Sequence, residues 1–162
     1  MVALDRADAL QDAPDLRRVA ASRTDNGGVR VALSLADRFT ARDLLAAEDT
    51  VGPPGSICVR LWTVSRPGAT PPDLLACVTA RADGRALRST ISREAPGTLP
   101  VPVGSATLTR PSTKSVALVV APELIGRARR VAFAAEATRP GCARVRCVDS
   151  APNRGTKTLR MR

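Results

Sequence analysis

Apolar and polar residues alternate in short runs along this chain of 162 residues. In the clearest run, 29–35, every second residue is apolar, which is the period of a β-strand with one buried face. Asn26 and Gly27 stand between this run and an extended run at 16–24, and Asn-Gly favours the tight turn of a β-hairpin. The same criteria predict further strands at 57–64, 74–79, 86–92, 106–110, 115–121, 130–137 and 156–161.

Connections between these runs are rich in Pro and Gly, at 51–55, 67–72 and 96–102. Short helical turns are predicted at 41–48 and at 122–126, where Pro begins and Gly ends the segment. Eight or nine short strands with one or two helical turns predict an all-β fold, an antiparallel, jelly-roll-like β-sandwich. We expect residues 1–14 to be a loose lead-in or short helix and residues 15–162 to form a single domain.

The apolar residues are mostly Ala, Val and Leu, and the only aromatic residues are Phe39, Phe133 and Trp62. In the run 57–64, Cys58 and Trp62 share one face and the aliphatic residues the other, as in a central strand covered on both sides. We therefore interpret Trp62 as a core residue, which leaves no aromatic surface for stacking sugars. The chain contains no His, so neither Ser-His-Asp nor Cys-His catalysis can be assembled and we expect no enzyme.

Four cysteines occur, Cys58, Cys77, Cys142 and Cys147. Cys58 and Cys77 lie in two predicted strands that can pair, and Cys142 and Cys147 bracket a short loop, so local geometry favours these two bridges. Disulfides indicate an oxidising compartment. An all-cysteine zinc site is an alternative, although the usual pair of cysteines separated by two residues is missing. Four reduced, buried thiols are the third possibility.

The formal net charge is +10 and comes almost entirely from arginine. The basic tail Arg154, Lys157, Arg160 and Arg162 is a candidate polyanion contact. Sequence-specific nucleic-acid binding is disfavoured because stacking aromatic residues are lacking. A denser cluster, Arg127 to Arg130, is interpreted as a solvated strand edge.

The run from Gly141 to Gly155, in which Asp149-Ser150-Ala151-Pro152 leads into the last strand, resembles the closing motif of DOMON-like β-sandwich domains. The opening from Asp12 to Val19, with the Asn26-Gly27 hairpin, is similar to that family's first two strands. These domains resemble family 9 carbohydrate-binding modules and are common in exported actinobacterial proteins. The resemblance implies binding of a sugar, haem or another small ligand, and the lack of His disfavours haem.

The same resemblance implies a possible structural calcium site near the chain ends, with Asp12, Asp15 and Asp149 as ligands, because calcium prefers carboxylate oxygens. The alternative is that the Asp149 side chain caps its own turn. No other cofactor is expected.

No window of about 18 apolar residues occurs, so no transmembrane segment is expected. The segment after Met1 also lacks the apolar core of a signal peptide. We expect a non-enzymatic binding module outside the cell or on its envelope, with an unidentified protein or envelope ligand as its partner. The alternatives are a structural or assembly subunit that packs a sheet face on another protein, and a basic polyanion-binding protein.

Overall fold

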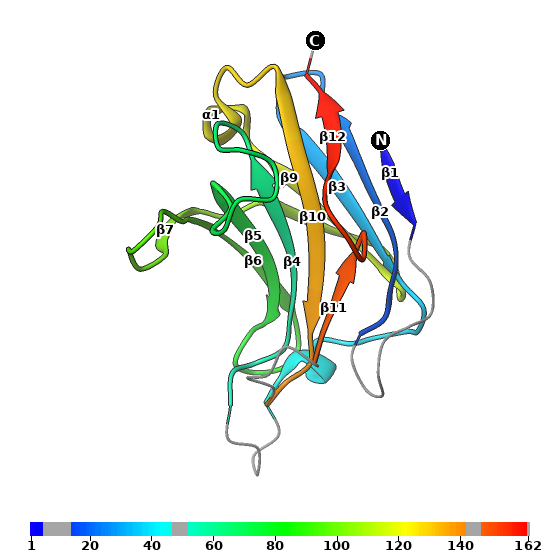
Figure 1. Cartoon of the computed structure of the whole chain (residues 1–162). Helices are drawn as coiled ribbons and strands as arrows, with labels where there is room; N and C mark the ends of the chain where they lie inside the picture. Colours follow the sequence, from blue (N-terminus) through cyan, green and yellow to red (C-terminus); the bar gives the residue numbers. More distant parts are fainter. Residues whose placement is uncertain (5–13, 47–51, 142–146, 162) are drawn as a thin grey trace.

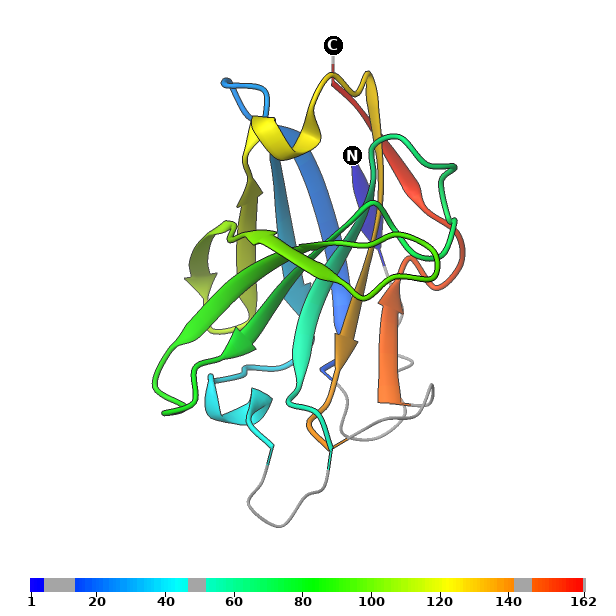
Figure 2. The same cartoon turned by 90° about the vertical axis from the view of Figure 1, so that its left-hand side faces the viewer.

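The structure, a computed structural model, describes residues 1–4, 14–46, 52–141 and 147–161. Two antiparallel sheets lie face to face (Figures 1 and 2). This arrangement confirms the predicted all-β sandwich. Among the described residues, no helix is long and apolar enough to cross a membrane.

The first sheet has five strands in the order β1, β2, β3, β9, β8. Its central hairpin joins β2 and β3 through the predicted Asn-Gly turn, where the Asn26 side chain accepts hydrogen bonds from Thr24 and from the Gly28 N–H. Positive φ at Gly27 fits that turn. The strands are β1 (Val2–Leu4), β2 (Leu16–Arg23), β3 (Val29–Leu35), β8 (Thr107–Ser112) and β9 (Ser115–Val120).

The second sheet has seven strands, and six of them follow the order β11, β10, β4, β5, β6, β7. The seventh, β12, pairs with the first part of β10, and β11 pairs with the last part, so both lie along one edge of that strand (Figure 1). These strands are β4 (Ser56–Trp62), β5 (Leu74–Ala80), β6 (Leu87–Arg93), β7 (Val101–Gly104), β10 (Arg130–Thr138), β11 (Val148–Ala151) and β12 (Lys157–Arg160).

The hydrophobic core lies between the two sheets and is mainly aliphatic. Alternate residues of the central strands point into it, for example Val29, Val31 and Leu33 on β3 and Ile57 and Val59 on β4. Phe133 is the largest fully buried side chain, and Phe39 lies near the rim of the core with the Arg110 guanidinium 4.7 Å from its ring centre. A chain poor in aromatic residues thus fills its core with branched aliphatic side chains.

Two short helical turns accompany the crossings between the sheets. The 3₁₀ turn η1 (Arg42–Leu44) follows β3, within the range 41–48 predicted to be helical, and it buries Leu44. The helix α1 (Pro122–Ile125) lies between β9 and β10, begins at Pro122 and is followed by Gly126, as the sequence predicts.

Three strands lie outside the predicted strand segments. Residues 2–4, predicted as part of a lead-in, form β1 and pair with β2. β7 contains Pro102, which has no backbone N–H to donate. An edge strand such as β7 tolerates a proline, because one of its two sides has no neighbouring strand to bond to. β11 occupies the start of the segment interpreted as a turn, where Asp149 and Ala151 face the interior.

Candidate functional site

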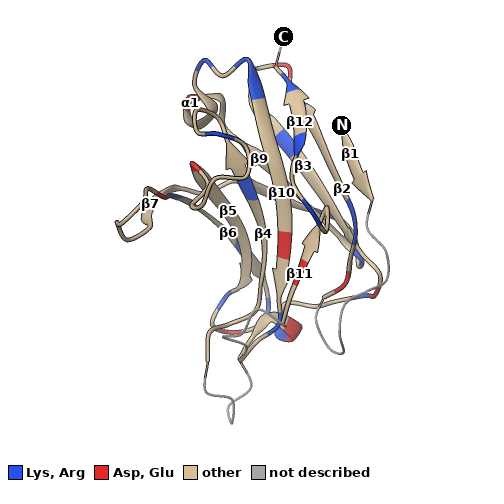
Figure 3. Ribbon diagram, in the orientation of Figure 1, with Lys and Arg blue, Asp and Glu red and all other residues tan. Residues whose placement is uncertain are grey.

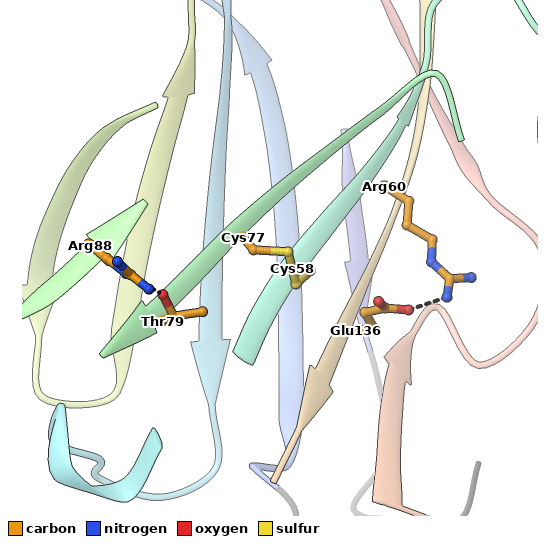
Figure 4. Close-up of a disulfide and its surroundings, with 6 residues drawn as sticks. All are labelled: Cys58, Arg60, Cys77, Thr79, Arg88 and Glu136. Atoms are coloured by element: carbon orange, nitrogen blue, oxygen red, sulfur yellow. Dashed lines mark hydrogen bonds and ion pairs between the residues drawn. A yellow bond between two sulfur atoms is a disulfide. The ribbon is translucent and has the colours of Figure 1, made fainter. Parts of the chain in front are cut away.

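The candidate site lies on the outer face of the seven-stranded sheet, and the alternation of β4 creates it. Ile57, Val59 and Leu61 point into the core, so Cys58, Arg60 and Trp62 point to the opposite face. Figure 4 shows the centre of this face, where the Cys58–Cys77 disulfide lies between the pair Arg60 and Glu136 on one side and Thr79 and Arg88 on the other.

The disulfide joins β4 to β5 at directly opposite positions. It confirms the predicted Cys58–Cys77 bridge and excludes a zinc site made from all four cysteines, because a thiol in a disulfide is no metal ligand. Cys147 is also not a free thiol, while its predicted partner Cys142 lies outside the described residues.

Arg60 and Glu136 form an ion pair across β4 and β10. Glu136 is directly opposite Cys58, so Arg60 reaches it diagonally, over two positions of the register. The Glu136 side chain is 16% exposed and that of Arg60 is 43% exposed. Burial raises the pKa of the Glu136 carboxyl above its usual range, Arg60 acts against this shift, and Glu94 adds to it.

Trp62 is buried, as the sequence predicts, but on the outer face of the sheet rather than between the sheets. Its indole N–H donates a hydrogen bond of 2.7 Å to the Ala69 carbonyl, which lies in the connection between β4 and β5. That connection is held by Asp73, whose carboxylate accepts hydrogen bonds from the backbone N–H groups of Thr63, Val64 and Ser65 and from the Ser65 hydroxyl.

The balance of these contacts lowers the pKa of Asp73. Burial acts in the opposite direction and raises the pKa, but the bonds from Ser65, Val64 and Thr63 favour the charged carboxylate and prevail. An ionised Asp73 therefore keeps the connection folded against Trp62.

A pocket of about 230 Å³ opens beside these residues. Its floor is formed by β10 at Ala134, and Arg60, Glu136 and Trp62 lie along it. Two connections form the sides, one before β5 at Gly68 and one between β11 and β12. The remaining lining residues are Ala135, Ser150, Pro152, Asn153, Gly155 and Thr156. The pocket thus combines a charged pair, hydroxyl and amide groups, and the side of Trp62.

A larger hollow of about 570 Å³ lies at the end of the sandwich beside α1. Asp73, Glu94 and Glu123 line it together with Arg93 and Arg127. The Asp73 carboxylate there is already occupied by the N–H groups of its own connection. The smaller pocket is the better candidate site, because its charged pair is partly desolvated and stands among polar groups of several connections.

The residues predicted to bind calcium are only partly described. Asp12 lies outside the described residues. The two carboxylate oxygens of Asp149 accept the N–H of Leu16 at 2.5 Å and of Ser150 at 2.9 Å, so this side chain, which belongs to β11, ties β11 to β2. Asp15 pairs with Arg17 at 3.2 Å, and its buried Oδ1 atom has no hydrogen-bond partner among the residues that the structure describes. No cluster of three potential metal-ligating side chains occurs in the described ranges, and calcium binding stays a prediction.

The predicted polyanion contacts Arg154, Lys157 and Arg160 are exposed around β12, and Arg162 lies outside the described residues. Basic positions gather at the start of β10, the end of β12 and the loop before β10 (Figure 3). The register places Arg130 directly opposite Arg160. Two basic segments that are distant in the sequence therefore meet at one end of the sheet.

Sequence analysis did not find the Arg60–Glu136 pair or the pocket around it. The two residues are far apart in the chain, and only the pairing of β4 with β10 brings them together. The charged positions on the exposed face of each predicted strand were the available indication, but the order of strands in the sheet was needed to join them.

Searches of protein-family models, curated proteins and solved structures found no match to this chain.

Proposed function

We propose that this chain is a non-enzymatic binding module of an exported protein, and that it takes a polar ligand in the pocket over β4 and β10. The observation that carries the proposal is the Arg60–Glu136 pair in a concave, partly desolvated setting. Such a pair offers both donors and acceptors to a hydroxyl-rich ligand, and burial strengthens the bonds it makes.

The setting of the pocket supports binding over catalysis. The chain has no His, and the Glu136 carboxylate is paired with a guanidinium rather than with a second acid that could share a proton. The disulfide beside the pocket supports export, since disulfides persist mainly in oxidising compartments.

The disulfide and the Asp73 connection also hold the pocket walls in place. β4 and β5 are covalently joined beside it, and Asp73 fixes the connection whose Ala69 carbonyl accepts the Trp62 N–H. A rigid, preformed pocket avoids the entropy cost of ordering loops on binding, which favours a recognition role.

The test is a ligand titration that uses the intrinsic fluorescence of Trp62, the only tryptophan in the chain. The probes are neutral and acidic oligosaccharides, offered to the wild type and to Ala134→Phe, which fills the pocket floor without removing a polar group. Thr90→Phe, at an exposed position of β6 on the same face, is the matched control. The proposal predicts that a ligand binds the wild type and Thr90→Phe but not Ala134→Phe. Equal binding to both variants would place the ligand elsewhere.

A further inference from the structure

Arg130 and Arg160 lie directly opposite each other on β10 and β12, and both are exposed. Their neighbours Val131 and Leu159 pack toward the core, so the two arginines project from the outer face, the face that carries the pocket. Directly opposite like charges destabilise a sheet. Neither arginine has an ion-pair partner in the part of the chain that the structure describes. The arrangement therefore leaves two guanidinium groups available to an anion from outside.

The two arginines line an open groove of about 540 Å³ together with Met1, Thr158 and Leu159. The groove and the pocket are two separate hollows beside the same segment of chain, since Thr158 of β12 lines the groove and Thr156, just before β12, lines the pocket. Arg160 and Thr156 are four residues apart, which is about 13 Å along an extended strand. An elongated ligand seated in the pocket can thus reach the arginine pair.

The chemistry of the surface restricts the class of that ligand. Phe39 and Phe133 are buried, and Trp62 is covered and uses its N–H within the protein, so no aromatic face is open for stacking. Neutral sugars and nucleic-acid bases both depend heavily on such stacking. A guanidinium group instead forms two parallel hydrogen bonds with a carboxylate, which gives geometric specificity without an aromatic ring.

We propose that the ligand is a linear polysaccharide that carries carboxylate groups, with one sugar unit in the pocket and a neighbouring carboxylate held by Arg130 and Arg160. This inference rests on the proposed function, because it assigns a ligand class to the same pocket. The hydroxyl groups of the seated unit meet Arg60, Glu136 and Asn153, and the chain continues along Thr156 and Thr158 to the arginine pair.

The experiment is isothermal titration of the full chain with oligosaccharides of galacturonate, alginate and hyaluronan. Methyl-esterified oligogalacturonate keeps the sugar backbone and loses the charges, and oligothymidylate supplies a polyanion without the sugar acid. The variant Arg130→Gln/Arg160→Gln removes the arginine pair. Arg81→Gln/Arg85→Gln removes two exposed arginines around the β5–β6 turn and is the charge-matched control. Circular dichroism and thermal melting verify that each variant is folded.

We expect at least one of the three acidic glycans to bind. Loss of the arginine pair should weaken that binding by about tenfold or more, since charge-assisted hydrogen bonds are roughly twice as strong as those between neutral groups. The control variant should bind the acidic glycan as tightly as the wild type does. The affinity for the esterified ligand should be the same for the two variants. Ala134→Phe should abolish binding.

Three results would overturn the inference. The first is that none of the acidic glycans binds. In that case, binding of a neutral sugar that Ala134→Phe abolishes would leave the proposed function intact. The second is that Arg130→Gln/Arg160→Gln binds the acidic glycan as tightly as the control variant does. The third is that oligothymidylate binds as tightly as the glycan and is unaffected by Ala134→Phe, which would indicate general attraction of polyanions.

Discussion

The carboxylate of Glu136 on β10 pairs with the guanidinium of Arg60 on β4, on the face of the sheet that points away from the core. Burial dominates the environment of this carboxyl and raises its pKa despite the ion pair. Such an arrangement is typical of binding sites rather than of surfaces selected for stability alone.

The raised pKa of Glu136 predicts how Glu136→Gln changes stability with pH. A group whose pKa is raised by folding contributes stability at low pH, and this contribution is lost as the pH rises through the folded-state pKa. The ordinary value for Glu is 4.5. The difference in Tm, variant minus wild type, should therefore be more positive near pH 7.5 than near pH 4. Glu123→Gln, an exposed position of α1, is the control. A difference that becomes more negative with rising pH would contradict the desolvated environment of Glu136.

The lowered pKa of Asp73 predicts the opposite dependence of stability on pH. Its pKa is lowered, so the stability that it contributes is present above the ordinary value of 3.8 and is lost as the pH falls. Asp73→Asn should lower the free energy of unfolding by about 1–2 kcal/mol at neutral pH, because the backbone N–H groups of the connection lose a charged acceptor. The penalty should shrink in acid. Urea titrations at neutral pH and in acid, below the ordinary pKa of 3.8, test this. The control is Asp25→Asn, a substitution at an exposed turn position.

The Cys58–Cys77 bridge predicts a loss of stability when it is removed. The two residues are 19 positions apart, and a loop of that size corresponds to about 3 kcal/mol of stabilisation through the unfolded state. Cys58→Ala/Cys77→Ala should show this loss in urea denaturation and keep its circular dichroism spectrum. An unchanged denaturation midpoint would mean that the sheet holds these two strands in register without the bridge.

If the protein is exported, its cysteines should be oxidised in the freshly purified native protein. A thiol titration under denaturing conditions should find no free cysteine, because both predicted bridges form in an oxidising compartment. Four titratable thiols would instead support a cytosolic protein and the polyanion-binding alternative.

The predicted calcium site implies that a chelator lowers the thermal stability of the protein. If Asp15 and Asp149 hold calcium together with Asp12, EGTA should lower the Tm and added calcium should restore it. The hydrogen bonds that Asp149 accepts from Leu16 and Ser150 already stabilise this side chain without a metal. An unchanged melting curve would mean that Asp149 stabilises the fold through these hydrogen bonds alone.

The alternation of residues along the chain was sufficient to predict the fold class. Strands with a clear period of two, such as β3, coincide with predicted segments because burial on one face requires that pattern. The strands that were missed have only three or four residues, and β7 also contains Pro102 and buries neither face, so burial imposes no alternation on it.

The candidate site was only partly predictable. The common face of Cys58 and Trp62 follows from the period of β4 and is confirmed. Trp62 was correctly expected to be buried, but its position outside the main core depends on the connection that Asp73 holds, which residue types alone do not indicate. The meetings of Arg60 with Glu136 and of Arg130 with Arg160 depend on strand order, a property of the folded sheet rather than of any local segment.

The most direct measurement of the central claim is the fluorescence of Trp62 during titration with an acidic oligosaccharide. The account predicts a saturable change in emission for the wild type, because Trp62 lines the pocket, and no change for Ala134→Phe under the same conditions. Saturable binding detected by calorimetry while Trp62 emission stays constant, or binding that Ala134→Phe leaves unaltered, would contradict the claim that the pocket over β4 and β10 is the binding site.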